Sequence, residues 1–75
     1  MPALKLWQCV TVNRRAGYIF DYKRSGPKKG KYAVAIPSLG RSVFVSEEDL
    51  NPRDCSVTMR KRIREHQKML KNLDF

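Results

Sequence analysis

The sequence has few of the side chains that build metal centres. It contains one histidine and two cysteines, Cys9 and Cys55, which stand far apart and form no CxxC pair. A structural zinc site needs about four such ligands at short spacings. We therefore expect no metal site and no cofactor.

Signals for catalysis are equally scarce. The carboxylates gather in one short segment, "SEEDLNPRD", where they also suit the first turn of a helix or a hinge. No Ser/His/Asp or Cys/His signature is present, and "SGPKKG" lacks the Lys-Ser or Lys-Thr of a phosphate-cradling loop. The sequence predicts a protein that is not an enzyme.

Long apolar segments are also missing. No window approaches the roughly 20 apolar residues of a membrane span, and "MPALKLWQCV" lacks the arrangement of a signal peptide. We expect a cytoplasmic protein with no membrane partner. In that compartment Cys9 and Cys55 are expected to be reduced thiols, and a disulfide between them is the alternative.

Acidic residues are outnumbered, with 7 Asp and Glu against 16 Lys and Arg, which gives a net charge of +9. The excess is uneven, because two basic segments, residues 1–45 and 56–75, flank the acidic segment 46–55. A small compact chain with so much like charge repels itself, so it is expected to have a polyanionic partner. Nucleic acid, either DNA or RNA, is the commonest such partner, and an acidic protein is the alternative.

Alternating apolar residues predict short β-strands in the first fifty residues. The expected strands cover residues 4–12, 16–22, 31–36 and 41–46, with Gly17 supplying a positive φ or a bulge after the first turn. "EEDL" predicts one helical turn with Leu50 in the core, and no apolar fifth strand follows it. Phe20 and Phe44 are expected in the core, and Tyr22 and Tyr32 at the surface.

Apolar residues on both faces of such strands favour a curled sheet over a flat one. The order of parts, with a long second hairpin and the finish "SVFVSEEDL", resembles the SH3-like small barrels, which include KOW-type and Tudor-type modules. The predicted fold is mainly β with one helix. Residues 1–52 would form an SH3-like barrel of four to five antiparallel strands, and residues 53–75 a C-terminal basic amphipathic helix.

The segment "SVTMRKRIREHQKMLKNL" contains no proline or glycine, and Ser56 can cap its first turn. Its apolar stripe has the spacing of one helix face. The stripe consists of Met59, Ile63, His66, Leu70 and Leu73. It can dock on the barrel, where Trp7 is a candidate contact, or pair with a second copy in a homodimer. The basic face could instead enter a DNA groove. His66 is interpreted as a histidine of the core or seam edge.

The candidate nucleic-acid-binding residues are basic side chains of the loops and the helix, together with two tyrosines that could stack on bases. They are Arg14, Arg15, Tyr22, Lys23, Arg24, Lys28, Lys29, Lys31, Tyr32, Arg41, Arg60, Lys61 and Arg64. The hypothesis requires that these cations converge into one patch. Its structural alternative is that "DYKRSGPKKGKY" is only a solvated hairpin tip.

Two functions follow from these patterns. The first is a nucleic-acid-binding module that contacts phosphates with weak sequence preference, since no base-reading array is apparent. The second is a protein-interaction adaptor or accessory regulator that holds an acidic partner through the barrel and the helix.

Overall fold

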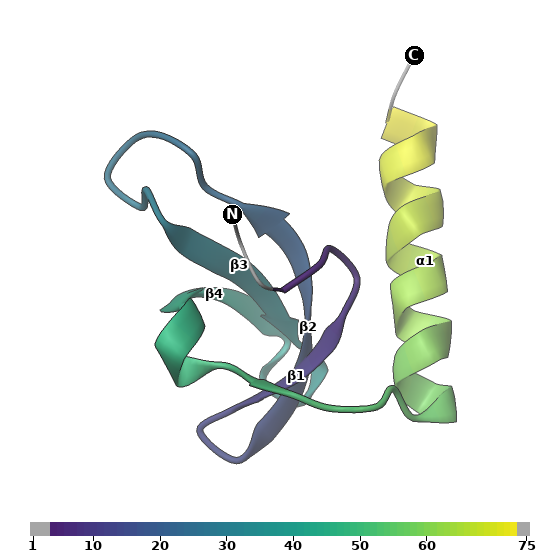
Figure 1. Ribbon diagram of the computed structural model, residues 1–75. Helices are drawn as coiled ribbons and strands as arrows, with labels where there is room; N and C mark the ends of the chain where they lie inside the picture. Colours follow the sequence, from purple (N-terminus) through teal and green to yellow (C-terminus); the bar gives the residue numbers. More distant parts are fainter. Residues whose placement is uncertain (1–3, 74–75) are drawn as a thin grey trace.

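The computed structural model describes residues 4–73, and the side chains of residues 4–70. Five antiparallel strands precede one helix (Figure 1), which confirms the mainly β class with a C-terminal helix. The elements are β1 (Cys9–Val12), β2 (Arg15–Tyr22), β3 (Lys31–Ile36), the 3-10 turn η1 (Pro37–Leu39), β4 (Arg41–Ser46), the 3-10 turn η2 (Glu47–Asp49), β5 (Asn51–Pro52) and α1 (Val57–Leu73).

The sheet has the strand order β4-β3-β2-β1-β5, so β4 and β5 form its two edges. Within the described residues no ladder joins these edges, and the sheet is curled without closing into a barrel. No apolar fifth strand was expected after Leu50, but a two-residue strand, β5, lies there. It pairs Asn51 with Thr11 and Pro52 with Val10. The sequence hid this strand because its pairing uses backbone groups and needs no apolar side chain.

One face of the sheet, called the inner face below, carries the main core. Val10, Ile19 and Val34 are fully buried there, and Leu50 drops onto them from behind η2, as predicted. The alternation expected in β3 is confirmed, because its even-numbered residues all enter this core. Val43 and Val45 of β4 pack against the same cluster.

Strand β1 is shorter than expected, since residues 4–8 bend instead of extending it. Trp7 adopts a positive φ of 66°, and its N–H still donates to the carbonyl of Ile19 at 2.6 Å. The bend turns Leu4 towards the inner core and Trp7 towards the other face of the sheet, called the outer face. Alternation alone did not reveal this bend because both side chains keep an apolar environment.

A bulge in β2 corrects the predicted faces of the aromatic residues. The register with β3 shifts between Ile19 and Asp21, so Tyr22 changes to the inner face, whereas it was expected to share a face with Phe20. Its ring there lies 4.9 Å from that of Tyr32. Tyr32 is 2% exposed, so its prediction as a surface ring is wrong, and Tyr22 is half-buried.

The β1–β2 hairpin is closed by two residues with positive φ, Asn13 at 51° and Arg14 at 65°. This is the conformation of a tight two-residue hairpin turn. Gly17 therefore does not supply the positive φ that was expected of it. Its missing side chain matters for another reason, because a Cβ at Gly17 would lie 2.7 Å from the carbonyl oxygen of Ala35.

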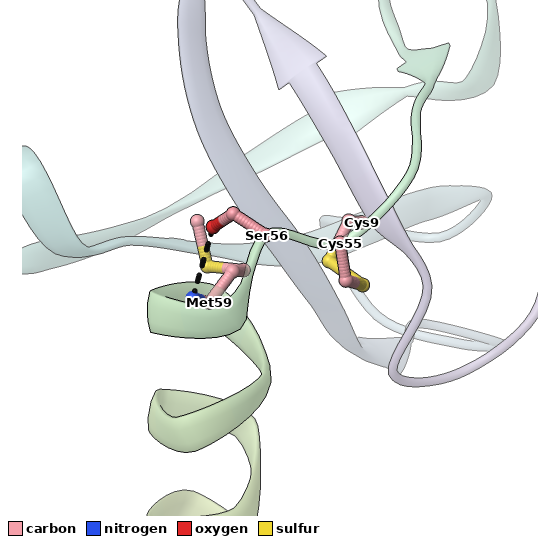
Figure 2. Close-up of a disulfide and its surroundings, with 4 residues drawn as sticks. All are labelled: Cys9, Cys55, Ser56 and Met59. Atoms are coloured by element: carbon pink, nitrogen blue, oxygen red, sulfur yellow. Dashed lines mark hydrogen bonds between the residues drawn. A yellow bond between two sulfur atoms is a disulfide. The ribbon is translucent and has the colours of Figure 1, made fainter.

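A disulfide between Cys9 and Cys55 joins β1 to the segment before α1 (Figure 2), which overturns the prediction of two reduced thiols. The sequence separation of 46 residues gave no sign of their proximity. Disulfides are rare in a reducing cytosol, so this bond is unusual for the predicted cytoplasmic location. That location remains a prediction. One residue further on, Ser56 caps the helix as predicted, since its Oγ accepts the N–H of Met59 at 3.1 Å.

Helix α1 packs on the outer face against β2, as the docking interpretation predicted. Ile63 is 8% exposed and joins Cys9 and Tyr18 in a second, outer core, with Met59 partly buried beside them. The stripe does not dock along its whole length. Leu70 is 45% exposed, and the side chain of Leu73 lies outside the described residues.

Candidate nucleic-acid interface

The predicted cations lie in separate groups, because the length of β2 separates the group at one end of the strand from the group at the other. Arg15 begins this eight-residue strand and Tyr22 ends it, which separates the two ends by about 23 Å at 3.3 Å per residue. The expectation that these charges pool on one side of the sheet is wrong. The group at the hairpin end after β2, called the loop cluster, comprises Lys23, Arg24, Lys28, Lys29 and Lys31. The group at the opposite end, called the turn cluster, comprises Arg14, Arg15 and Arg41.

The loop cluster stands on an ordered turn. The N–H of Lys23 donates to the carbonyl of Lys31 at 2.9 Å, and the N–H of Gly30 donates back to the carbonyl of Lys23 at 2.8 Å. Gly30 adopts φ 83°, which a side chain would strain. Lys23 also pairs with the carboxylate of Asp21 at 3.2 Å. The backbone thus presents these cations in a defined hairpin rather than in an open coil.

Phe44 lies next to the loop cluster. Its prediction as a core residue is wrong. It is 41% exposed. Two ammonium groups approach the ring, Nζ of Lys23 at 5.8 Å and Nζ of Lys28 at 5.6 Å from its centroid. These are cation–π distances. Alternation could have revealed this residue, because Val43 and Val45 enter the inner core and Phe44 must face the other way.

The turn cluster borders a groove of about 890 Å³ at the open end of the inner face. Val12, Ile36 and Val43 contribute apolar surface to it. Glu48 and Asp49 line the same groove, so carboxylates offset the charge of the three arginines. This groove is therefore mixed in charge and suits a polyanion less well than the loop cluster does.

The helix cations predicted as phosphate contacts, Arg60, Lys61 and Arg64, are exposed. A different residue, Arg62, lines a groove of about 480 Å³ between α1 and strands β3 and β4. At about 100° per residue, Arg62 and Arg64 lie on opposite flanks of the buried Ile63. Arg64 therefore faces away from the groove. The sequence did not single out Arg62, because only the docked position of the helix distinguishes it from its neighbours.

His66 is held in an aromatic cluster between α1 and the sheet. Its ring centroid lies 5.3 Å from that of Trp7 and 5.1 Å from that of Phe20. The Tyr18 hydroxyl lies 2.7 Å from Nδ1 of His66, and it donates in the tautomer whose ring proton is on Nε2 and accepts in the tautomer whose proton is on Nδ1. Burial raises the pKa of Tyr18 above 10.0, and the Arg62 guanidinium partly opposes the rise. This supports the interpretation of His66 as a packing residue and confirms Trp7 as a contact of the helix.

The described part of the chain forms no group of three or more His, Cys, Asp or Glu side chains placed to hold a metal ion. Among the same residues, no helix combines the length and the apolar character that crossing a membrane requires. Comparisons of the chain with protein-family models, with curated proteins and with solved structures find no match.

Proposed function

We propose that this chain is a small nucleic-acid-binding module of the SH3-like type, and that it contacts phosphates through the loop cluster alone, since the single patch of all the predicted cations does not form. The observation that carries the proposal is the loop itself. Five cationic side chains project from one hydrogen-bonded hairpin, and one carboxylate, Asp21, pairs among them. The strand order, with a short last strand beside β1, supports the likeness to SH3-like barrels.

The chemistry of the cluster suits a phosphate backbone. Arg24 offers a planar guanidinium that can grip two phosphate oxygens, whereas the lysines are flexible point charges that can follow an irregular chain. Nothing in the cluster resembles an array of side chains for reading base edges, so sequence preference should be weak. DNA and RNA are both candidate ligands.

Salt dependence tests the electrostatic part of the proposal. If the five cations each neutralise one phosphate, log Kd should rise with log salt with a slope of about 3.5 on a single strand and about 4.5 on duplex DNA. The measurement is fluorescence anisotropy of a labelled 20-nucleotide probe at several salt concentrations. Absent binding at low salt, or binding that salt does not weaken, would refute the proposal.

Charge reversals locate the site. Lys28→Glu with Lys29→Glu should weaken binding by at least tenfold, because it removes two cations and adds two carboxylates within the cluster. The matched control is Arg60→Glu with Lys61→Glu, which makes the same change in net charge on exposed helix positions. The control should weaken binding much less. Equal losses would show that net charge, and not the loop cluster, governs binding.

The alternative function is an adaptor for an acidic protein, and two observations favour it. The turn-cluster groove combines an apolar floor with arginines. On α1, Met69 is 62% exposed and Leu70 is 45% exposed, so the end of the stripe offers apolar contact to a partner or a second copy. Arg15→Glu separates the two functions, since Arg15 lines the turn-cluster groove but not the groove beside α1, and its change leaves the loop cluster intact. Unchanged nucleic-acid affinity in this variant supports the loop cluster as the site.

A further inference from the structure

We infer that Phe44 is a base-stacking residue and that the ligand of the loop cluster is single-stranded nucleic acid. The inference rests on the proposed function and adds the class of substrate to it. It starts from the fact that Phe44 is a 41% exposed aromatic ring that lies among cations and belongs to neither apolar core.

The ring of Phe44 is partly accessible, and a base that stacks on it would displace the flexible lysine ammonium groups that lie over it. In the β3–β4 ladder Phe44 is the partner of Ala33, and Ser42 is the partner of Ala35, so small side chains flank it on the outer face. Helix α1 covers β2 on this face. Ala33 is 2% exposed and Ala35 packs against the outer core, so the open platform on this face is the edge strand β4, where Phe44 stands beside Ser42.

The lysines near the ring fit the phosphates that flank a stacked base. Lys23 and Lys28 approach the ring to 5.8 and 5.6 Å from its centroid. In a nucleic-acid strand, the sugar attached to each base is linked to a phosphate on either side. A base stacked on Phe44 would therefore place phosphates within reach of these flexible ammonium groups. An aromatic surface bordered by cations is the arrangement by which proteins bind single strands without reading sequence.

A duplex cannot use this site in the same way. Its bases are stacked on one another inside the helix, and only its phosphates and groove edges face a protein. Phe44 would then contribute little to duplex binding, whereas each base stacked on an aromatic side chain strengthens single-strand binding several-fold or more. The ring thus predicts that the protein prefers single strands to duplexes, although both are polyanions.

The groove beside α1 offers a continuation for the strand. It begins at Ser42 of the platform. Arg41 borders it on the strand side, and Arg62, Glu65 and Met69 border it on the helix side, so two guanidinium groups stand against one carboxylate. A chain leaving Phe44 along this groove would meet a guanidinium that can bind a further phosphate. Arg62 is thereby assigned a role that its neighbour Arg64, on the opposite flank, does not share.

The test compares a labelled single-stranded 20-mer with a hairpin duplex of the same composition, at one low salt concentration. Phe44→Ala should weaken single-strand binding about 5-fold to 140-fold and change duplex binding less than twofold. Phe44→Trp should retain the affinity, and the fluorescence of the new indole should be quenched by the single strand. Leu39→Ala is the matched control, because Leu39 is 38% exposed and lies at the other end of the sheet, in the turn-cluster groove. Far-UV circular dichroism checks the fold of each variant.

The outcomes separate this inference from the proposed function. If Phe44→Ala leaves single-strand affinity unchanged, or weakens both ligands equally, stacking is refuted, even though salt-dependent binding through the loop cluster stands. If the unaltered protein binds neither probe at low salt, the proposed function itself fails. A single-strand preference that Phe44→Ala abolishes and Phe44→Trp restores would establish the stacking role.

Discussion

Removing the Cys9–Cys55 disulfide should cost this protein a large part of its stability. The bond closes a loop with a sequence separation of 46 residues. Loop-closure entropy of that length corresponds to about 4 kcal/mol at 25 °C. A chain of this size has a free energy of unfolding of roughly 4–11 kcal/mol, so the loss is comparable with the total. Chains near this length often need such a covalent link because their cores are small.

The position of the disulfide determines which part of the structure separates first when the bond is removed. Cys55 immediately precedes α1, and Cys9 is 2% exposed in the outer core. The docked part of the helix rests on Met59, Ile63 and His66. Without the covalent link, those contacts alone must hold α1 against the sheet. We expect the helix to separate at lower denaturant than the sheet unfolds.

Urea unfolding measures both effects. Trp7 is the sole tryptophan and touches His66, so its fluorescence reports helix docking, while far-UV circular dichroism reports secondary structure. With an m-value of about 1 kcal/mol/M, the loss of about 4 kcal/mol lowers the midpoint by about 4 M. The midpoints of wild type with reductant and of the Cys9→Ala/Cys55→Ala variant should agree, because both lack the covalent link. Alanine is used in place of serine because it buries no hydroxyl. A shift below about 1 M, or two titratable thiols in the protein as purified, would refute the reasoning.

Four substitutions test the sheet, its first hairpin turn and the helix. Gly17→Ala should destabilise by about 1–3 kcal/mol in thermal unfolding, because its Cβ would lie 2.7 Å from the backbone oxygen of Ala35; an unchanged Tm would contradict this contact. Arg14→Gly should raise stability by about 1 kcal/mol, since glycine tolerates the φ of 65° at this turn, and a loss would mean that the arginine side chain stabilises the hairpin. Ile63→Ala should cost about 2–4 kcal/mol in urea unfolding, whereas Leu70→Ala, at an exposed position of the same stripe, should cost under about 0.5 kcal/mol; similar costs would contradict the partial docking of α1.

Alkaline pH should destabilise the protein through its buried tyrosines. Burial raises the pKa of Tyr18 and that of Tyr32 above 10.0. The folded state therefore holds these protons more tightly than the unfolded state does. Their contribution to stability is complete below pH 10 and is lost as the pH rises beyond it.

The sequence revealed those parts of the fold that depend on local patterns. Alternation in β3 predicts which side chains enter the inner core, and the stripe from Met59 to Ile63 predicts the docked face of α1. Leu50 was predicted in the core because a helical turn after β4 returns the chain to the sheet. Each of these predictions needs only the period of the side chains along one element.

The errors concern pairs of residues that are distant in the chain. The bulge after Ile19 depends on the register with β3, which no single strand encodes. The disulfide depends on where β5 leaves the segment before α1, and the split of the cations depends on the length of β2. Phe44 is different, because its exposure follows from local alternation and was missed through the assumption that a small core needs every large ring.

The disulfide and the stacking site are connected through the outer face. Helix α1 covers Tyr18 and Phe20 and leaves the platform around Phe44 open, so the covalent link near its start determines which aromatic rings are accessible. If reduction releases the helix, two further rings become available on the face that carries Phe44, and single-strand binding should tighten while duplex binding does not. Anisotropy of the single-stranded probe with and without reductant measures this. Weaker binding of both probes after reduction would report the loss of the fold, which far-UV circular dichroism of the same sample checks. Weaker single-strand binding by a protein that stays folded would mean that the docked helix, through Arg62 and its groove, contributes more to the site than the rings that it covers.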